Sequence, residues 1–221
     1  MFGYENFSST IKSMNDYTLK EHDFAEITAF IESRGIKLLV ADLNGVVDDY
    51  YNLKFAYLKK LLGDDEQYFA RLVVYIEREY MSNREATLEQ SIMKFYAENN
   101  LTFSDSQIAI LKEKLPRSII TDAARTFFEN LTTEYVIYTS LHAANAHESL
   151  RGLDCTVYTG DMTHETKPSV VNLQRIFEKH GVTADQACVI GDGLVDDLMP
   201  AKLIGAHTIL VSPFAEKTIT V

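Results

Sequence analysis

The chain has 221 residues, of which 46% are hydrophobic and 24% charged, the composition of an ordinary globular protein with room for one core or for a core and a smaller lobe. Acidic residues outnumber basic ones by 32 to 21, and the formal charge of −11 argues against nucleic acid or an anionic membrane as a partner. Two cysteines allow neither a disulfide framework nor a zinc site, and no run of residues resembles a signal peptide or a membrane span. We therefore expect a cytoplasmic protein.

A helix and then a buried strand are predicted near the start of the chain. Four apolar residues at helical spacing precede Gly35, a typical C-terminal cap: Phe24, Ile27, Phe30 and Ile31. The apolar run 38–41 predicts a buried strand of a parallel sheet. It ends at Asp42, and open α/β sheets bind their ligands at this end of the strands. A carboxylate at this place serves as a nucleophile or as a metal ligand.

Residues 49–117 carry helical patterns and no strand-like run. Apolar stripes predict helices over 55–62 and 69–80, and two capping-box patterns predict the start of two more, Ser82 with Glu85 and Ser104 with Gln107. Four helices in succession predict a small helical bundle. We expect this bundle to be inserted into an α/β core formed by residues 1–48 and 118–221, of which 1–35 are an N-terminal extension.

From residue 118 onwards, strand and helix patterns alternate. Apolar runs predict strands over 135–138, 155–158, 187–190 and 208–211, with helical patterns between them. Wholly apolar strands separated by helices predict an α/β fold in three layers, with a parallel sheet covered by helices on both faces.

Polar residues that could bind an anion follow the strand predicted over 135–138. The hydroxyl groups of Thr139 and Ser140, at the end of that strand, can donate hydrogen bonds to phosphoryl oxygens. Lys167 precedes a proline at the start of a predicted helix. An ammonium group close to Asp42 would keep that carboxylate ionised and would neutralise a phosphate dianion.

An acidic loop follows the strand predicted over 187–190. Asp192, Asp196 and Asp197 stand in the stretch Gly-Asp-Gly-Leu-Val-Asp-Asp. Three carboxylates in one loop repel each other unless a cation offsets their charge. Because the ligands are oxygen atoms without histidine or cysteine, we predict that the cation is Mg²⁺.

These stretches together resemble the four motifs of the haloacid dehalogenase (HAD) superfamily of hydrolases. Asp42-Leu43-Asn44-Gly45-Val46 is similar to the first motif, Thr139 to the second, Lys167 to the third, and 191–197 to the fourth. The resemblance covers 37–211. It implies a HAD-like, Rossmann-type core, with a helical cap inserted between the first and second motifs.

The resemblance also implies a reaction and a role for each residue. Asp42 would attack the phosphorus of a small phosphorylated metabolite and form an aspartyl-phosphate, which water then hydrolyses. Mg²⁺ would bind Asp42, the main-chain carbonyl of Asn44, and Asp192, with Asp196 or Asp197 orienting its waters. Thr139, Ser140 and Lys167 would hold the phosphoryl group. The oligomeric state stays open.

Asn44 departs from the family pattern, which has the acid/base aspartate at this position. A carboxamide leaves main-chain metal binding intact but cannot exchange a proton with the leaving group or with water. Loss of such a group costs about two to four orders of magnitude in rate. Three interpretations follow: a slow phosphatase or one with a good leaving group, a phosphatase with a proton relay through Asp48, Asp49, His142 or a residue of the helical cap, or a non-catalytic binding or regulatory protein. A dehalogenase fits less well, because dehalogenases of the superfamily dispense with the metal.

Overall fold

A computed structural model describes residues 17–19, 24–63, 66–82, 87–113, 115–162 and 167–211. The chain divides into two compact units, one formed by 1–51 and 117–221, the other by 52–116. The first unit holds the strands β1 (Tyr17–Leu19), β2 (Leu38–Ala41), β3 (Glu134–Tyr138), β4 (Thr156–Tyr158), β5 (Ala187–Gly191) and β6 (His207–Val211). Its helices are α2 (Phe24–Arg34), α7 (Asp122–Asn130), α8 (Ala143–Leu150), α9 (Val170–Lys179) and α10 (Met199–Leu203), with the short turns η1 (Ala184–Gln186) and η2 (Leu194–Leu198).

The described strands form a six-stranded parallel sheet in the order β1-β6-β5-β2-β3-β4. Strand β2 lies at its centre, and Ala41 is paired with Ile137 of β3 on one side and Ile190 of β5 on the other. All four residues of β2 are buried, as expected for a central strand covered on both faces. Because the three strands are parallel and in register, the residues that follow them meet at one edge of the sheet.

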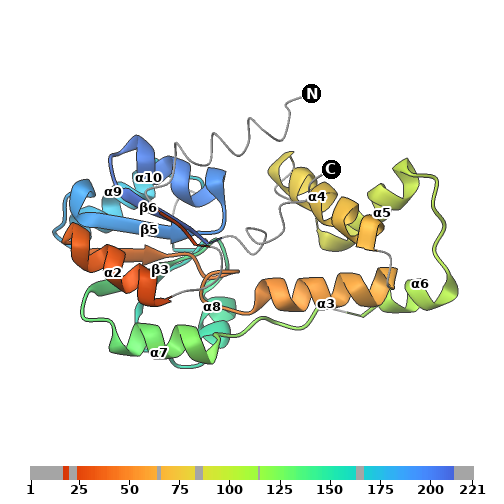
Figure 1. The fold of residues 1–221 in the computed structure, drawn as a ribbon, viewed down its shortest axis with the longest axis horizontal. Coiled ribbons are helices and arrows are strands. Elements are labelled where there is room, and N and C mark those ends of the chain that lie inside the picture. The colour runs from red at the N-terminus through yellow and green to blue at the C-terminus, as the bar shows by residue number, and fades with distance from the viewer. Residues whose placement is uncertain are drawn as a thin grey trace. The chain divides into compact units, whose positions relative to one another are not determined.

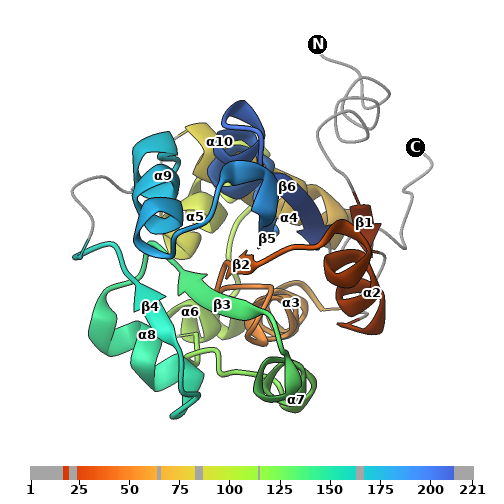
Figure 2. The ribbon, with the colours of Figure 1, turned by 90° about the vertical axis from the view of Figure 1, so that its left-hand side faces the viewer.

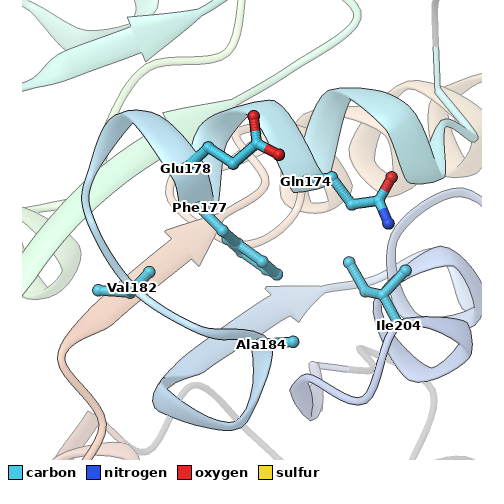
Figure 3. Close-up of a pocket in the computed structure, with 6 residues that line it drawn as sticks. All are labelled: Gln174, Phe177, Glu178, Val182, Ala184 and Ile204. Carbon is cyan, nitrogen blue, oxygen red and sulfur yellow. The ribbon is translucent and has the colours of Figure 1, made fainter.

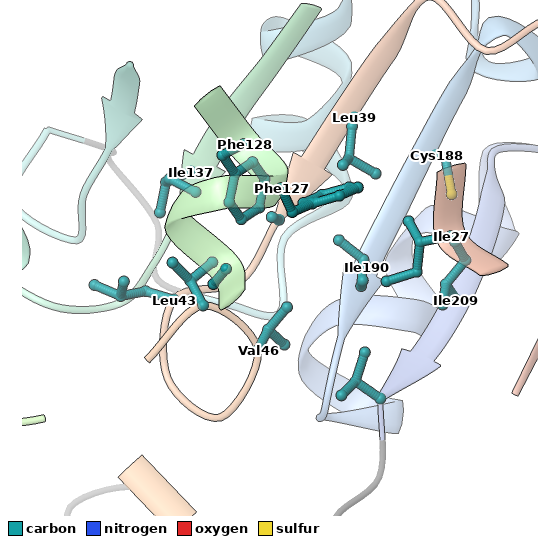
Figure 4. Close-up of a cluster of buried hydrophobic side chains, with 14 of the residues drawn as sticks. Ile27, Leu39, Leu43, Val46, Phe127, Phe128, Ile137, Cys188, Ile190 and Ile209 are labelled. Atoms are coloured by element: carbon teal, nitrogen blue, oxygen red, sulfur yellow. The ribbon is translucent and has the colours of Figure 1, made fainter. Parts of the chain in front are cut away.

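Helices cover both faces of the sheet (Figure 2). Successive residues of a strand point to opposite faces. Leu39, Ile137 and Ile190 therefore pack on one side, against residues of α2, α7 and α8 such as Ile27 and Phe127 (Figure 4). The alternate strand residues pack on the other side, against α9 and α10: Leu38, Val40, Val136, Tyr138, Ala187 and Val189. The predicted three-layer α/β fold is confirmed.

The second unit is helical in its described residues (Figure 1). Helix α3 (Tyr50–Leu62) begins in the first unit and continues into the second, where it is followed by α4 (Glu66–Ser82), α5 (Leu88–Glu98) and α6 (Asp105–Leu111). Buried residues from α3, α4 and α5 form a separate apolar core: Leu58, Leu61, Leu72, Val73, Tyr75, Ile76, Ile92, Phe95 and Tyr96.

One of the two predicted capping boxes is correct and the other is wrong. Ser104 and Gln107 cap α6 in both directions, as the sequence indicates. Ser82 instead is the last residue of α4, and Glu85 lies outside the described residues. Helix α5 begins at Leu88, six residues after Ser82, and is capped by Thr87 and Gln90. Thr87 and Gln90 have the same capping-box spacing, so local pattern alone did not distinguish the two starts.

The segments that lead out of and back into the first unit run side by side. Asp48 and Ile120 form an antiparallel bridge. The Asp49 amide donates to the Ile119 carbonyl at 3.1 Å, and the Ile119 amide donates to Asp49 Oδ1 at 2.8 Å. No helix within the described ranges has both the length and the apolar composition needed to cross a membrane.

Candidate functional site

Three predicted site residues follow adjacent strands at the carboxyl edge of the sheet. Asp42 follows β2, Thr139 follows β3, and Asp192 follows β5. The pairing of the strands extends into this edge, since the Asp42 amide donates to the Ile190 carbonyl at 2.9 Å. The parallel register therefore brings together residues that are up to 150 positions apart in the sequence.

Asp42, Asp192 and Asp197 form an acidic cluster. Each offers one carboxylate oxygen, and these oxygen atoms lie within 4.8 Å of one another. Lys167 lies against two of them, its Nζ 2.5 Å from Asp42 Oδ1 and 2.6 Å from Asp197 Oδ1. The side chains of Lys167, Asp42 and Asp197 are only 5%, 12% and 3% exposed, so water screens these charges weakly.

The pKa values of the cluster residues reflect burial and an excess of negative over positive charge. Burial raises the pKa of Asp42 and of Asp197, the latter to about 6, and in both cases Lys167 opposes the rise. Burial, together with the charges of Asp42 and Asp197, raises the pKa of Asp192 well above its usual value. Burial acts to lower the pKa of Lys167, but the negative charges of Asp197 and Asp42 outweigh this effect. The pKa of Lys167 is therefore raised above its usual value, and the ammonium group stays charged.

These residues fit a divalent cation. With all carboxylates ionised, the cluster and Lys167 carry a net charge of −2, which one divalent ion would neutralise. Convergent carboxylate oxygens are ligands for Mg²⁺ or Ca²⁺. Asp42 and Asp192 are the best placed to bind it directly, because Asp197 already accepts hydrogen bonds on both oxygens, from Lys167 on Oδ1 and from the Gly193 amide on Oδ2.

A π-helical turn determines which of the two neighbouring aspartates reaches the cluster. In η2 the Leu198 amide donates to the Gly193 carbonyl and the Met199 amide to that of Leu194, five residues back in each case. This wider turn directs Asp197 into the cluster, whereas Asp196 is not among its three members. Gly191 makes room for Asp197, since a Cβ atom at Gly191 would lie 2.4 Å from the Asp197 side chain.

Asn44 has its side chain turned towards Asp48. Its Nδ2 donates to Asp48 Oδ2 at 2.9 Å and to Ser118 Oγ at 3.3 Å. Asp48 is 3% exposed and also accepts from the Ser118 hydroxyl at 2.5 Å and from the amides of Gly45 and Tyr50. Burial raises the pKa of Asp48, and these hydrogen bonds oppose that rise. The contact with Ser118, which is 74 residues away in the sequence, carries no signal that sequence reasoning could have used.

The other two residues named as possible proton relays have different surroundings. Asp49 Oδ1 accepts from the Ile119 amide. The side chain of His142 is 78% exposed, and its Nδ1 lies 3.9 Å from Asp161 Oδ2. Of the three residues, Asp48 is the one in contact with Asn44.

The predicted phosphoryl-binding residues lie after β3 and before α9. Thr139 is buried, and its Oγ1 accepts from the Leu141 amide at 3.2 Å, which leaves the O–H free to donate in another direction. Ser140 is exposed, with its carbonyl packed against Gly160, where an added Cβ would lie 2.5 Å away. Glu165 and Thr166, which precede Lys167, lie outside the described residues.

Tyr51 contacts the acidic cluster, although nothing in the sequence pattern indicated it. Its hydroxyl donates to Asp192 Oδ2 at 2.5 Å. The Tyr51 ring lies over Gly45, so close that a Cβ at Gly45 would be 2.3 Å from it. Gly45 also has φ of +77°, which favours glycine.

A pocket of about 260 Å³ lies on the α9 side of the first unit (Figure 3). It is lined by Gln174, Phe177, Glu178, Val182, Ala184 and Ile204. Val182 and Ala184 precede β5, whereas the acidic cluster follows the carboxyl ends of the strands. The pocket is therefore separate from the predicted site.

Comparison with known proteins agrees with the class that fold and motifs indicate, a HAD-like α/β core with a helical insertion. A family model described as HAD-hydrolase-like matches residues 165–213, which include Lys167 and the acidic loop. A search of curated proteins found no match. The resemblance to the HAD superfamily is confirmed by this model together with solved structures of the same fold.

Three of those structures illustrate the similarity. A predicted phosphoglycolate phosphatase from Haemophilus somnus 129PT is 15% identical over 80% of this chain and 85% of its own, with a TM-score of 0.54. A HAD-superfamily hydrolase of subfamily IA from Geobacter sulfurreducens PCA is 16% identical over 81% and 89%, with a TM-score of 0.55. The HAD-hydrolase YfnB of Bacillus subtilis, bound to magnesium, is 18% identical over 79% and 86%, also with a TM-score of 0.55.

Proposed function

We propose that this chain is a Mg²⁺-dependent phosphatase that acts on a small phosphorylated metabolite through an aspartyl-phosphate on Asp42. The observation that carries the proposal is the acidic cluster, in which three carboxylates, one buried and two partly buried, share a single ammonium group that contacts two of them. Such a site has a strong electrostatic preference for a divalent cation and for the anion that accompanies it. The magnesium in the Bacillus subtilis structure supports the choice of metal.

Each residue has a distinct task in this proposal. Asp42, Asp192 and the main-chain carbonyl of Asn44 would hold Mg²⁺, which when bound would offset the negative charge of the nucleophile and the phosphoryl group. An oxygen of Asp42 forms a bond to phosphorus while the bond from phosphorus to the leaving oxygen breaks. Lys167 keeps Asp42 ionised and, with the Thr139 hydroxyl, stabilises the phosphoryl oxygens. Water then hydrolyses the aspartyl-phosphate and regenerates Asp42.

Asn44 determines which substrates suit this site. Its carboxamide has no proton to give to a leaving alkoxide, and Asp48 behind it already accepts hydrogen bonds from four donors. Substrates whose leaving group is stable as an anion, such as acyl or aryl phosphates, need no such proton. We therefore expect them to react faster than alkyl phosphates by about two orders of magnitude or more.

The test is phosphate release from matched acyl, aryl and alkyl phosphates, with Mg²⁺ and with EDTA. Activity that needs Mg²⁺, decreases from acyl to alkyl phosphates and disappears in Asp42→Asn would support the proposal. Equal activity in EDTA, or an active Asp42→Asn protein, would contradict it.

The second candidate is a non-catalytic HAD-like protein that binds phosphate or a partner, and the hydrogen-bonded Asn44 favours it. In that case calorimetry should detect binding of Mg²⁺ and of inorganic phosphate, and none of the phosphate compounds should be hydrolysed. With either function, the formal charge of −11 argues against nucleic acid or an anionic membrane as a partner.

A further inference from the structure

Tyr51 has no part in the reaction proposed above, yet it contacts the acidic cluster directly. It is the second residue of α3 and the last residue of the first unit before the chain enters the helical unit. Its hydroxyl donates to Asp192 Oδ2 at 2.5 Å, a distance typical of strong hydrogen bonds to a carboxylate. This contact joins the start of α3 to a carboxylate that follows β5, 141 residues later in the chain.

The surroundings of Tyr51 fix the position of its hydroxyl. The ring occupies the space above Gly45 that any larger residue would fill, and the same hypothetical Cβ would lie 3.2 Å from Asp192 Oδ2. The preceding Tyr50 donates its amide to Asp48 Oδ1 at 3.2 Å and packs its ring edge-on against that of Tyr51, with centroids 5.5 Å apart. Packing of the Tyr51 ring against Gly45 and against the Tyr50 ring thus holds the hydroxyl in place.

The three carboxylates of the cluster are held by different kinds of donor. Lys167 holds Asp42 and Asp197 with a full positive charge. Tyr51 holds Asp192 with a neutral O–H group. A neutral donor restricts rotation of the carboxylate without adding positive charge that would repel a cation. Hydrogen bonds of this kind to metal ligands orient them, and their removal weakens metal binding by about 10- to 100-fold.

We propose that Tyr51 is a positioning residue for the cation, which holds Oδ2 of Asp192 and so presents Oδ1 of that carboxylate to the metal. This inference rests on the proposed Mg²⁺ site. It assigns a role in cation binding to a residue outside the four motifs, at the point where the chain enters the helical unit.

The test compares Tyr51→Phe, which keeps the ring and removes the hydroxyl, with Tyr50→Phe as the matched control. Calorimetric titration with MgCl₂ should give a dissociation constant about 10-fold weaker for Tyr51→Phe than for the wild-type chain. Tyr50→Phe should bind as the wild type does. A lower melting temperature of Tyr51→Phe with unchanged Mg²⁺ affinity would mean a purely structural role, and tighter binding would mean that the hydroxyl competes with the cation. Either result would overturn the inference.

Tyrosine fluorescence gives a second measurement on the folded wild-type chain. The chain has 12 tyrosines and no tryptophan, so tyrosine emission is not masked. Mg²⁺ withdraws charge from Asp192 and weakens its hydrogen bond to Tyr51, so emission should change in the wild type and in Tyr50→Phe, and not in Tyr51→Phe. An identical change in Tyr51→Phe would refute the role of Tyr51. If the wild type binds no Mg²⁺ at all, the proposed metal site itself fails, which this titration separates from a failure of Tyr51 alone.

Discussion

Replacing Asn44 by aspartate tests the hydrogen bond between Asn44 and Asp48. In the wild-type chain Nδ2 of Asn44 donates to Asp48 Oδ2 at 2.9 Å. In Asn44→Asp an oxygen takes the place of that donor and faces the buried Asp48 carboxylate. The substitution that matches the family pattern should therefore destabilise this chain at neutral pH.

The loss of stability in Asn44→Asp is limited, because one of the two carboxylates can take up a proton. Two carboxylates about 3 Å apart repel by roughly 5 kcal/mol at an effective dielectric constant of about 20. Binding one proton removes the repulsion, and at pH 7 this costs about 4 kcal/mol for a carboxyl group of ordinary pKa. Rearrangement of the loop reduces the cost further. We expect the free energy of unfolding to fall by about 2 to 4 kcal/mol at pH 7 and by about 1 to 2 kcal/mol at pH 5, where protonation is easier.

Urea unfolding of both proteins in EDTA, between pH 5 and pH 8, measures this difference. EDTA keeps Mg²⁺ from contributing to the comparison. A difference below about 0.5 kcal/mol at pH 7, or one that does not change with pH, would refute the reasoning.

The exchanged pair, Asn44→Asp with Asp48→Asn, gives the corresponding test of activity. It again places one carboxamide beside one carboxylate, so most of the lost stability should return. It also supplies a carboxyl group at position 44 that can exchange a proton. Hydrolysis of alkyl phosphates should then rise at least about tenfold over the wild type, a modest part of what general acid catalysis provides. No increase in a stable, Mg²⁺-binding double variant would favour the non-catalytic function.

Three further predictions concern the acidic cluster. Lys167→Met should lower the free energy of unfolding in EDTA by about 3 to 5 kcal/mol in urea titrations, because two buried carboxylates lose their partner, and Mg²⁺ should restore part of it. In EDTA the free energy of unfolding should rise as the pH falls from about 7 to 5. The pKa of Asp197 is about 6 in the folded chain and 3.8 in the unfolded chain, so the folded chain takes up the proton first. Saturating Mg²⁺ should abolish this pH dependence. Gly191→Ala should cost about 1 to 3 kcal/mol in thermal unfolding and weaken Mg²⁺ binding in calorimetry, because the added methyl group collides with Asp197; unchanged values would contradict the packing described here.

The sequence predicted the sheet core well because its signals are local. Strand β2 is a continuous apolar run that ends at a carboxylate, and the helices on either side have clear apolar spacing and glycine caps, such as Gly35 with φ of +63°. Parallel pairing of such strands is enough to bring Asp42 and Asp192 together. In the structure Lys167 lies shortly before α9 and its Nζ contacts Asp42, a position that the strand pattern alone does not explain.

Long-range and irregular features could not be predicted in this way. Strand β1 lies in a polar stretch, and its pairing with β6 is a contact across almost the whole chain. The choice between Asp196 and Asp197 depends on a π-helical turn, whose extra residue leaves no mark in the apolar pattern. Tyr51 and Ser118 reach the site through contacts that span 141 and 70 residues, respectively.

The antiparallel bridge between Asp48 and Ile120 has a consequence for how this protein can be rebuilt. The two places where the chain leaves and re-enters the α/β core are already joined by hydrogen bonds that belong to the core itself. A short turn could therefore replace residues 52–116 without separating the strands on either side, and only a small loop would have to close. The helical unit is in this sense an exchangeable module, and chimaeras that carry the helical unit of a relative should keep the Asp42 cluster.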